Sequence, residues 1–350
     1  MAPTVTIALD AMGGDNAPDA VIEGADAARI RYPDLSFVLV GDEAKLAPLM
    51  HRYPELAAIS EIRHSETVVG ADDKPSVALR QGRQSSMRLA IDAVKAGDAS
   101  GVVSAGNTGA LMAMSKFVLR TLEGIHRPAI ASIFPTMRGQ TVMLDLGANI
   151  DCTVENLVQF AVMGEVFARC VLGVVKPTVG LLNVGIEEFK GHDTVRGAAK
   201  ELAHVNLPIT FHGFVEGDDI TAGTVDVVVA DGFTGNIALK TAEGTARLYS
   251  QFLRAAFKDS LMSRLGYLLA RRSLGDLRDR LDPRRHNGGM FLGLNGVAVK
   301  SHGSTDAMGF ANAISFAYDM AREGYNDMVV AELNRWHEDR MEGEARAAAV

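Results

Sequence analysis

A buried-strand pattern changes to a helical pattern within the stretch Val102-Val103-Ser104-Ala105-Gly106-Asn107-Thr108-Gly109-Ala110-Leu111-Met112. Residues 101–103 form a short apolar run typical of a parallel strand, and a helical pattern follows over residues 110–122. Gly106 and Gly109 let the backbone approach a ligand, and the first helical turn leaves amide N–H groups unpaired. With the helix dipole and the side chains of Ser104, Asn107 and Thr108, these groups suit an anion such as phosphate. The alternative is an ordinary turn in which Asn107 or Thr108 only caps the helix.

The same order of strand, polar loop and helix recurs at least five times along the chain. Comparable loops occupy residues 10–15, 145–151, 185–191 and 231–236, the last of them followed by a helix predicted from Ile237. This alternation predicts an α/β fold with a doubly wound, mostly parallel sheet. Because ligands bind at the carboxyl ends of parallel strands, we expect all these loops to converge on one edge. Residues 1–345 are expected to form a single two-lobed catalytic unit.

Composition excludes several classes of protein. The 350 residues carry a formal net charge of −8, which argues against a general nucleic-acid binder. Cys152 and Cys170 provide neither a disulfide framework nor metal-ligand spacing. No signal peptide is visible, and no apolar run approaches the roughly 20 residues of a membrane-spanning helix. We therefore expect a cytoplasmic or peripheral protein.

Two loops carry charges that need an explanation. Asp10 and Asp15 would repel phosphate, so they are expected to orient a basic side chain or cap a helix rather than hold a cation. One long helix is predicted over residues 73–95, with Pro75 in its first turn. Lys74 lies beside that N-terminus, where the dipole disfavours a cation, so it either faces a ligand or acidic partner or is a solvated surface lysine.

The ordered motifs resemble those of the bacterial acyl-ACP:phosphate acyltransferase (PlsX-type) family. The resemblance covers residues 7–317 and rests on these segments: Asp10-Ala-Met-Gly-Gly-Asp15, Asp73-Lys-Pro-Ser76, Ser104-Ala-Gly-Asn-Thr-Gly109, Asp145-Leu-Gly-Ala-Asn149, Lys190-Gly191, Asp231-Gly-Phe-Thr-Gly-Asn236 and Lys300-Ser-His-Gly303. One departure is the run from His212 to Asp218, where the family usually has Gly-Asn-Val-Glu-Gly-Arg.

The resemblance implies a homodimer with an isocitrate/isopropylmalate-dehydrogenase-like fold. It also implies transfer of a fatty acyl group from acyl carrier protein to inorganic phosphate, giving acyl phosphate for phospholipid synthesis. The membrane glycerol-3-phosphate acyltransferase that consumes this product is then an expected partner. The alternatives are a phosphate acyltransferase acting on acyl-CoA and a non-catalytic, membrane-associated acyl-carrier scaffold. A dehydrogenase of the same fold would need an acid cluster for Mg²⁺ and an arginine cluster, neither of which is seen.

The chemistry requires positioning rather than a metal, a cofactor or a serine nucleophile. Phosphate dianion is a competent nucleophile near neutral pH, and a thiolate leaves without full protonation. We expect Ser104, Asn107, Thr108 and the backbone of Gly106 and Gly109 to hold phosphate. The remaining predicted site residues are Lys300, Ser304, Lys74 and Lys190 for positive charge or binding, and His302 or Asn236 for donation to the oxyanion or leaving sulfur. The alternatives are that Asn236 caps its helix, His302 orders its loop and Lys190 pairs with Glu187 or Glu188.

Residues 251–285 differ in character from the rest of the chain. Apolar residues recur there at helical spacing beside many arginines, so the segment is basic in an acidic protein. That pattern is typical of an interfacial helix on anionic lipid. We expect a protruding amphipathic helical pair that contacts the inner face of the cell membrane at the tip of a dimer, through Leu261, Leu265, Leu268, Leu269, Arg271 and Arg272. The same surface could contact acyl carrier protein, or its apolar stripe could be buried in the dimer.

Overall fold

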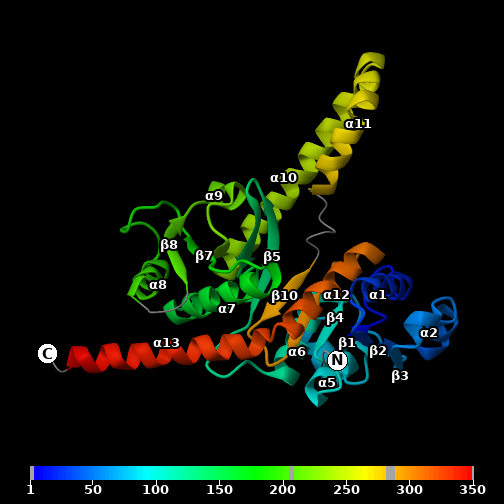
Figure 1. The fold of residues 1–350 in the computed structure, drawn as a ribbon, viewed down its shortest axis with the longest axis horizontal. Helices are drawn as coiled ribbons and strands as arrows, with labels where there is room; N and C mark the ends of the chain where they lie inside the picture. Colours follow the sequence, from blue (N-terminus) through cyan, green and yellow to red (C-terminus); the bar gives the residue numbers. More distant parts are fainter. Residues whose placement is uncertain (1–3, 205–208, 281–287, 349–350) are drawn as a thin grey trace.

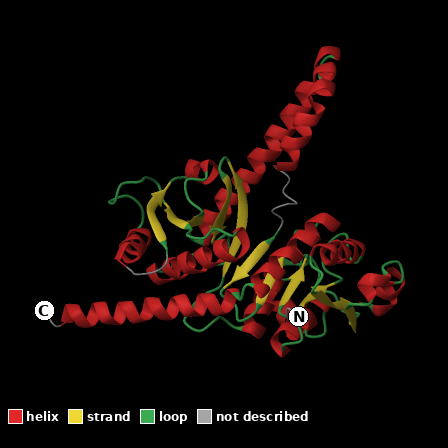
Figure 2. Ribbon diagram, in the orientation of Figure 1, coloured by secondary structure: helices red, strands yellow, loops and turns green. Residues whose placement is uncertain are grey.

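One sheet of 11 strands runs through the computed structural model, which describes residues 4–204, 209–280 and 288–348 (Figures 1 and 2). Its order is β3-β2-β1-β4-β11-β10-β5-β6-β9-β7-β8. The strands are β1 Val5–Asp10, β2 Leu35–Gly41, β3 Ser60–His64, β4 Gly101–Ser104, β5 Ala129–Thr136, β6 Gly139–Leu144, β7 Thr178–Leu182, β8 Thr210–Val215, β9 Val227–Val229, β10 Gly289–Leu292 and β11 Val297–Lys300.

Helices cover both faces of this sheet, which confirms the doubly wound α/β prediction. On β1, Ile7 and Leu9 pack into one apolar core while Ala8 packs into a second, because successive strand residues point to opposite faces. The helices are α1 Asp19–Arg31, α2 Glu43–Met50, α3 Pro54–Ala57, α4 Pro75–Gln81, α5 Ser86–Ala96, α6 Thr108–Leu119, α7 Val154–Leu172, α8 Asp193–His204, α9 Gly217–Ala222, α10 Gly232–Lys258, α11 Leu261–Arg280, α12 Ala307–Arg322 and α13 Tyr325–Ala348.

The sheet contains two groups of parallel strands that run in opposite directions. β3, β2, β1, β4 and β11 are parallel, and so are β6, β9, β7 and β8. Between the groups, β10 is antiparallel to β11 and β5, and β5 is antiparallel to β6. The carboxyl ends of the strands in one group therefore lie on the side of the sheet where the amino ends of the other group lie. We call these two sides, formed by the strand ends, the opposite edges of the sheet. The expectation that all the polar loops converge on one edge is wrong, although it holds within each group.

The long helix predicted over residues 73–95 is two helices, α4 and α5. The backbone leaves the helical path at Gly82, and Ser85 caps the next helix by accepting a hydrogen bond from the Arg88 amide (3.2 Å). The Ser85 hydroxyl also donates to the Gly82 carbonyl at 2.6 Å. A glycine stop followed by a serine cap ends one helix and begins another, although the apolar periodicity continues across the break.

Two short strands were not predicted from the sequence. β3 is a polar edge strand that no apolar run marks in the sequence, and β10 is a strand of four residues. The sequence pattern also predicts a strand over residues 207–211. β8 begins at Thr210, and residues 207 and 208 lie outside the described residues.

Helices α10 and α11 project from the body as an antiparallel pair (Figure 1). α10 begins at Gly232 rather than at the predicted Ile237, because the Asp231 side chain caps it by accepting from the Thr234 amide at 2.8 Å. The turn falls at residues 259–260, so the predicted segment 251–285 contains the end of α10 and all of α11, while residues 281–285 lie outside the described residues. Within the described part of the chain, no helix is long and apolar enough to cross a membrane.

Candidate functional site

Three loops meet at the edge where β1, β4 and β11 end. The Asp15 amide in the first loop donates to the Gly303 carbonyl in the third at 2.8 Å. A Cβ at Gly14, which has φ +102°, would lie 2.8 Å from the Ala105 Cβ and 3.0 Å from the Gly303 oxygen. Glycine is required there because both the backbone angle and the close approach exclude a side chain. These contacts bring Asp10, Ser104 and Lys300 into one cluster, called the first cluster below.

Asp10 is the buried centre of the first cluster. Its Oδ1 accepts from the Ser86 hydroxyl at 2.6 Å, and its Oδ2 accepts from the Ser104 hydroxyl at 2.7 Å. Burial raises the pKa of Asp10, while these hydrogen bonds and the charge of Lys300 act in the opposite direction. Ser86 was not predicted as part of the site. Its position next to Ser85, the residue that caps α5, is the signal in the sequence that could have identified it.

Lys300 is buried at the end of β11, with 8% of its surface exposed. Its ammonium donates to the Ala105 carbonyl at 3.3 Å and to the Ser301 carbonyl. Burial lowers the pKa of Lys300 to about 8, and the charges of Asp10 and Asp15 partly offset this effect. Asp10 and Asp15 therefore act on a basic side chain, and α1 has no side-chain cap. Among the described residues, no group of three His, Cys, Asp or Glu is placed to hold a metal ion.

The loop between β4 and α6 is shaped by Asn107. Its Oδ1 caps α6 by accepting from the Ala110 amide at 3.0 Å, so the cap that the sequence suggests at Asn107 is present. Its Nδ2 lies 2.8 to 3.2 Å from the carbonyl oxygens of Gly70, Ala71 and Asp73. The oxygen and the nitrogen of the Asn107 side-chain amide therefore both form hydrogen bonds that hold the loop in place. The Ser104 hydroxyl is engaged too, since it also accepts from the Gly106 amide at 3.0 Å.

The exposed part of this loop is Thr108 and Gly109, in the first turn of α6. Their amides lie where a helix provides no backbone partner, so this turn retains the capacity to bind an anion. A Cβ at Gly109 would lie 2.8 Å from Pro75 Cγ, so the start of α4 packs against the start of α6. Lys74 directly precedes Pro75 and is exposed beside this turn.

His302 and Ser304 lie in the third loop and contact each other. His302 Nδ1 is 3.0 Å from the Ser304 hydroxyl and accepts from the Ser304 amide at 3.4 Å. Both side chains are exposed. Acceptance at Nδ1 favours the tautomer that carries its proton on Nε2.

A second cluster forms around Asp145 at the opposite edge. Asp145 accepts from the amides of Ile130, Gly147, Ala148 and Asn149 and from the Asn149 side chain, at 2.7 to 3.2 Å. A Cβ at Gly147 would lie 2.8 Å from Asn236 Nδ2, so Asn236 rests against this loop. Because Asp231 caps α10, the alternative that Asn236 only caps its helix is wrong. Asn236 therefore lies in the second cluster with Asp145, whereas Lys300 lies in the first cluster with Asp10.

Lys190 belongs to the loop that follows β7. Its ammonium lies 3.0 Å from Glu187 Oε1, which confirms the ion-pair alternative. Asn183 Nδ2 donates to the carbonyls of Gly185 and Lys190 at 3.0 and 3.2 Å and folds the loop back on itself. Both partners of the ion pair are about half exposed, so the pair leaves Lys190 accessible to a ligand.

Comparison with known proteins agrees with this architecture. A phosphate acyltransferase of Rhodospirillum centenum is 64% identical over 335 residues, covering 96% of this chain and 94% of that protein. A phosphate acyltransferase of Rhodospirillum rubrum is 60% identical over 333 residues, covering 95% of each. A phosphotransacetylase from Streptococcus pyogenes matches in fold, with a TM-score of 0.63 at 18% identity over 91% of this chain and 94% of that one. A branched-chain phosphotransacylase from Enterococcus faecalis gives a TM-score of 0.52 at 15% identity, covering 90% and 98%.

The family model described as "Fatty acid synthesis protein" matches residues 5–328. That span includes every loop of both clusters. The chain belongs to the phosphate acyltransferase (PlsX) family of enzymes, which transfer an acyl group to phosphate.

Proposed function

We propose that this enzyme moves a fatty acyl group from acyl-[acyl carrier protein] to inorganic phosphate, giving acyl phosphate for phospholipid synthesis. The observation that carries the proposal is Lys300, a buried cation at the meeting point of three loops in a chain of this family. A fixed positive charge in a partly dehydrated site attracts a phosphate dianion more strongly than a solvent-exposed positive charge does.

The proposed reaction forms one bond and breaks one. A phosphate oxygen attacks the thioester carbonyl carbon, an oxyanion forms, and the C–S bond breaks to release the thiolate and acyl phosphate. The first turn of α6, at Thr108 and Gly109, and Lys300 hold phosphate, with Lys74 and Ser304 beside them. His302, in the same loop as Ser304, donates to the oxyanion or the sulfur. Positioning supplies roughly 7–11 kcal/mol of such a barrier and one oxyanion donor roughly 3–4 kcal/mol.

A phosphorolysis assay tests the reaction directly. Acyl-[acyl carrier protein] and phosphate are incubated with the enzyme, and the acyl phosphate is trapped with hydroxylamine. We expect hydroxamate that depends on phosphate and is unaffected by EDTA. Faster turnover with acyl-CoA would favour the alternative donor, and loss of activity in EDTA restored by Mg²⁺ would contradict the metal-free mechanism.

We further propose that the α10–α11 pair attaches a homodimer to the inner face of the cell membrane, near the glycerol-3-phosphate acyltransferase that consumes the product. Supporting this, the apolar side chains of α11 are exposed: Leu261 by 82%, Leu265 by 52%, Leu268 by 63% and Leu269 by 81%. Exposed arginines, among them Arg271 and Arg272, accompany them. An apolar stripe with basic neighbours is suited to an anionic lipid surface.

A double substitution separates membrane contact from a dimer core. Leu268→Glu with Leu269→Glu should release the enzyme from anionic liposomes while leaving an active dimer of unchanged sedimentation. Dissociation of the dimer with liposome binding retained would instead place the stripe at the subunit interface.

A further inference from the structure

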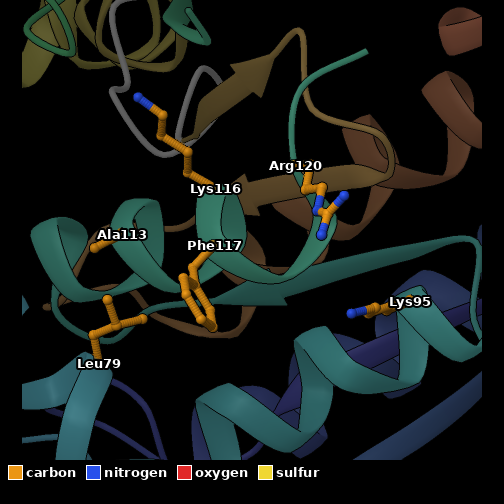
Figure 3. Close-up of a pocket in the computed structure, with 6 residues that line it drawn as sticks. All are labelled: Leu79, Lys95, Ala113, Lys116, Phe117 and Arg120. Atoms are coloured by element: carbon orange, nitrogen blue, oxygen red, sulfur yellow. The ribbon is translucent and has the colours of Figure 1, made fainter. Parts of the chain in front are cut away.

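A hollow lies beside the C-terminal half of α6. It is lined by Leu79, Lys95, Ala113, Lys116, Phe117 and Arg120, which come from α4, α5, α6 and the residue after α6 (Figure 3). Leu79, Ala113 and Phe117 form its apolar part, and the three cations stand around them. We call this hollow the basic groove.

The helices around the basic groove carry an unusual excess of positive charge. Helices α4, α5 and α6 contain the basic residues Arg80, Arg88, Lys95 and Lys116, and one acidic residue, Asp92. The Arg88 Nε lies 3.0 Å from Asp92 Oδ1, so a cation already neutralises that acid. The whole chain has 35 Lys and Arg against 43 Asp and Glu. The basic groove, lined by three cations and no acidic residue, therefore differs in charge from the chain as a whole.

One large apolar side chain stands exposed in this basic surface. Phe117 is 63% exposed, and its ring lies 5.8 Å from the Arg88 guanidinium carbon. An exposed aromatic residue in a hollow with cations around it matches the anchor and polar rim of a protein–protein interface. α11 differs, because it exposes a row of leucines on a projecting helix.

We propose that the basic groove is the docking surface for the acidic carrier protein that delivers the acyl group, an inference that rests on the proposed function. Charge complementarity identifies the occupant, since three of the six lining residues are cations and none is acidic. A second copy of this chain is disfavoured because a two-fold interface would place the basic patch against itself. The groove also lacks the apolar stripe that a membrane surface requires.

The position of the basic groove suits delivery to the first cluster. Phe117 and Thr108 lie on the same helix, α6, nine residues apart, or about 13 Å at the helical rise. Lys74 lies at the Thr108 end, because Pro75 packs against Gly109. A prosthetic arm that follows α6 from a carrier protein seated at Phe117 would thus reach the anion-binding turn.

Charge reversal with two donors tests the proposal. The variant Lys95→Glu/Lys116→Glu/Arg120→Glu is assayed with hexadecanoyl-[acyl carrier protein] and with the hexadecanoyl thioester of free pantetheine. We expect KM for the protein donor to rise about ten- to a hundredfold at low salt and less at high salt, because screening weakens exposed charge pairs. The pantetheine donor should be used as before, since these three residues lie outside both clusters. Phe117→Ala should raise KM for the protein donor alone.

A matched control is Arg52→Glu/Arg138→Glu/Lys176→Glu, which reverses three exposed cations elsewhere. It should leave both donors unchanged. An equal loss with both donors, an unchanged KM for the protein donor, or release from anionic liposomes without a change in KM would each overturn the proposal. Failure of the unaltered enzyme to use the protein donor, with the pantetheine donor still active, would instead contradict the proposed function.

Discussion

Asp10 and Asp145 are both buried carboxylates at strand ends, yet they accept hydrogen bonds from different kinds of donor. Asp10 accepts hydrogen bonds from the hydroxyls of Ser86 and Ser104, which belong to other elements, and it lies near Lys300. Asp145 accepts mainly from backbone amides of its own loop, with one more from Ile130. The first carboxylate joins three elements and influences a cation, while the second fixes the backbone of one loop.

The partners of the two carboxylates also differ in whether they can accept a hydrogen bond as well as donate one. A hydroxyl can donate or accept, so the environment of Asp10 can adapt to a change in charge. A backbone amide can only donate, so the environment of Asp145 cannot. This difference predicts a large loss of stability at Asp145 and a small one at Asp10 for the same Asp→Asn substitution.

Asp145→Asn should have the largest effect on stability. The new amide group would place N–H donors against N–H donors, leaving buried amides of Ile130 or Asn149 unpaired. Each unpaired buried group costs about 1–3 kcal/mol, so we expect a loss of about 3–5 kcal/mol in the free energy of unfolding. Urea denaturation measures this, and a loss below about 1 kcal/mol would show that the loop does not depend on the carboxylate.

Lys300→Met should remove the buried cation of the first cluster. We expect kcat/KM for phosphate to fall by about 10²–10³, the range for loss of one strong transition-state contact. The methionine fills most of the same volume, so the melting temperature should change little. Wild-type activity in this variant would exclude Lys300 from the reaction.

Substitutions of Asn107 and Thr108, adjacent residues between β4 and α6, should distinguish a structural role from a role in phosphate binding. Asn107→Ala removes a cap and the contacts to residues 70–73, so it should lower stability by about 1–2 kcal/mol. Thr108→Val should raise KM for phosphate several-fold with an unchanged melting temperature. The same unfolding and kinetic measurements on both variants decide the assignment, and a Thr108→Val enzyme with normal KM would leave the Thr108 hydroxyl without a binding role.

Asp10→Asn should have the smallest effect on stability, about 1 kcal/mol or less, because the Ser104 hydroxyl, which faces Oδ2, can turn to accept from the new amide. Its consequence is a change in pH dependence. The wild-type rate should fall as pH rises through about 8, where Lys300 loses its proton. Without the negative charge of Asp10, the pKa of Lys300 falls further, so the decline should begin at lower pH. An identical profile for the two enzymes would uncouple Asp10 from Lys300.

The same pKa has a consequence for stability, with the sign set by proton binding. The folded state holds Lys300 with a pKa of about 8, against an ordinary value of 10.5. Between these values the unfolded chain binds more protons, so Lys300 makes the free energy of unfolding rise with pH. Lys300→Met should remove that contribution in unfolding measurements between pH 8 and 10.

Local chemistry was enough to predict much of this protein from its sequence. The order of strands and helices, the cap at Asn107 and the loops bearing Ser104, Asn236 and Lys300 follow from periodicity and short-range capping. The ordered motifs also carried the family, because their residue types and spacing are visible along the chain.

Only the tertiary structure decided which of these loops meet. The antiparallel pairings of β10, β5 and β6 set the two strand groups in opposite directions and divide Lys300 from Asn236. Strand direction depends on pairing between residues far apart in sequence, and the four residues of β10 are too short to show it. The partners of Asp10 and the exposure of Phe117 likewise arise when distant elements pack together, so no local pattern records them.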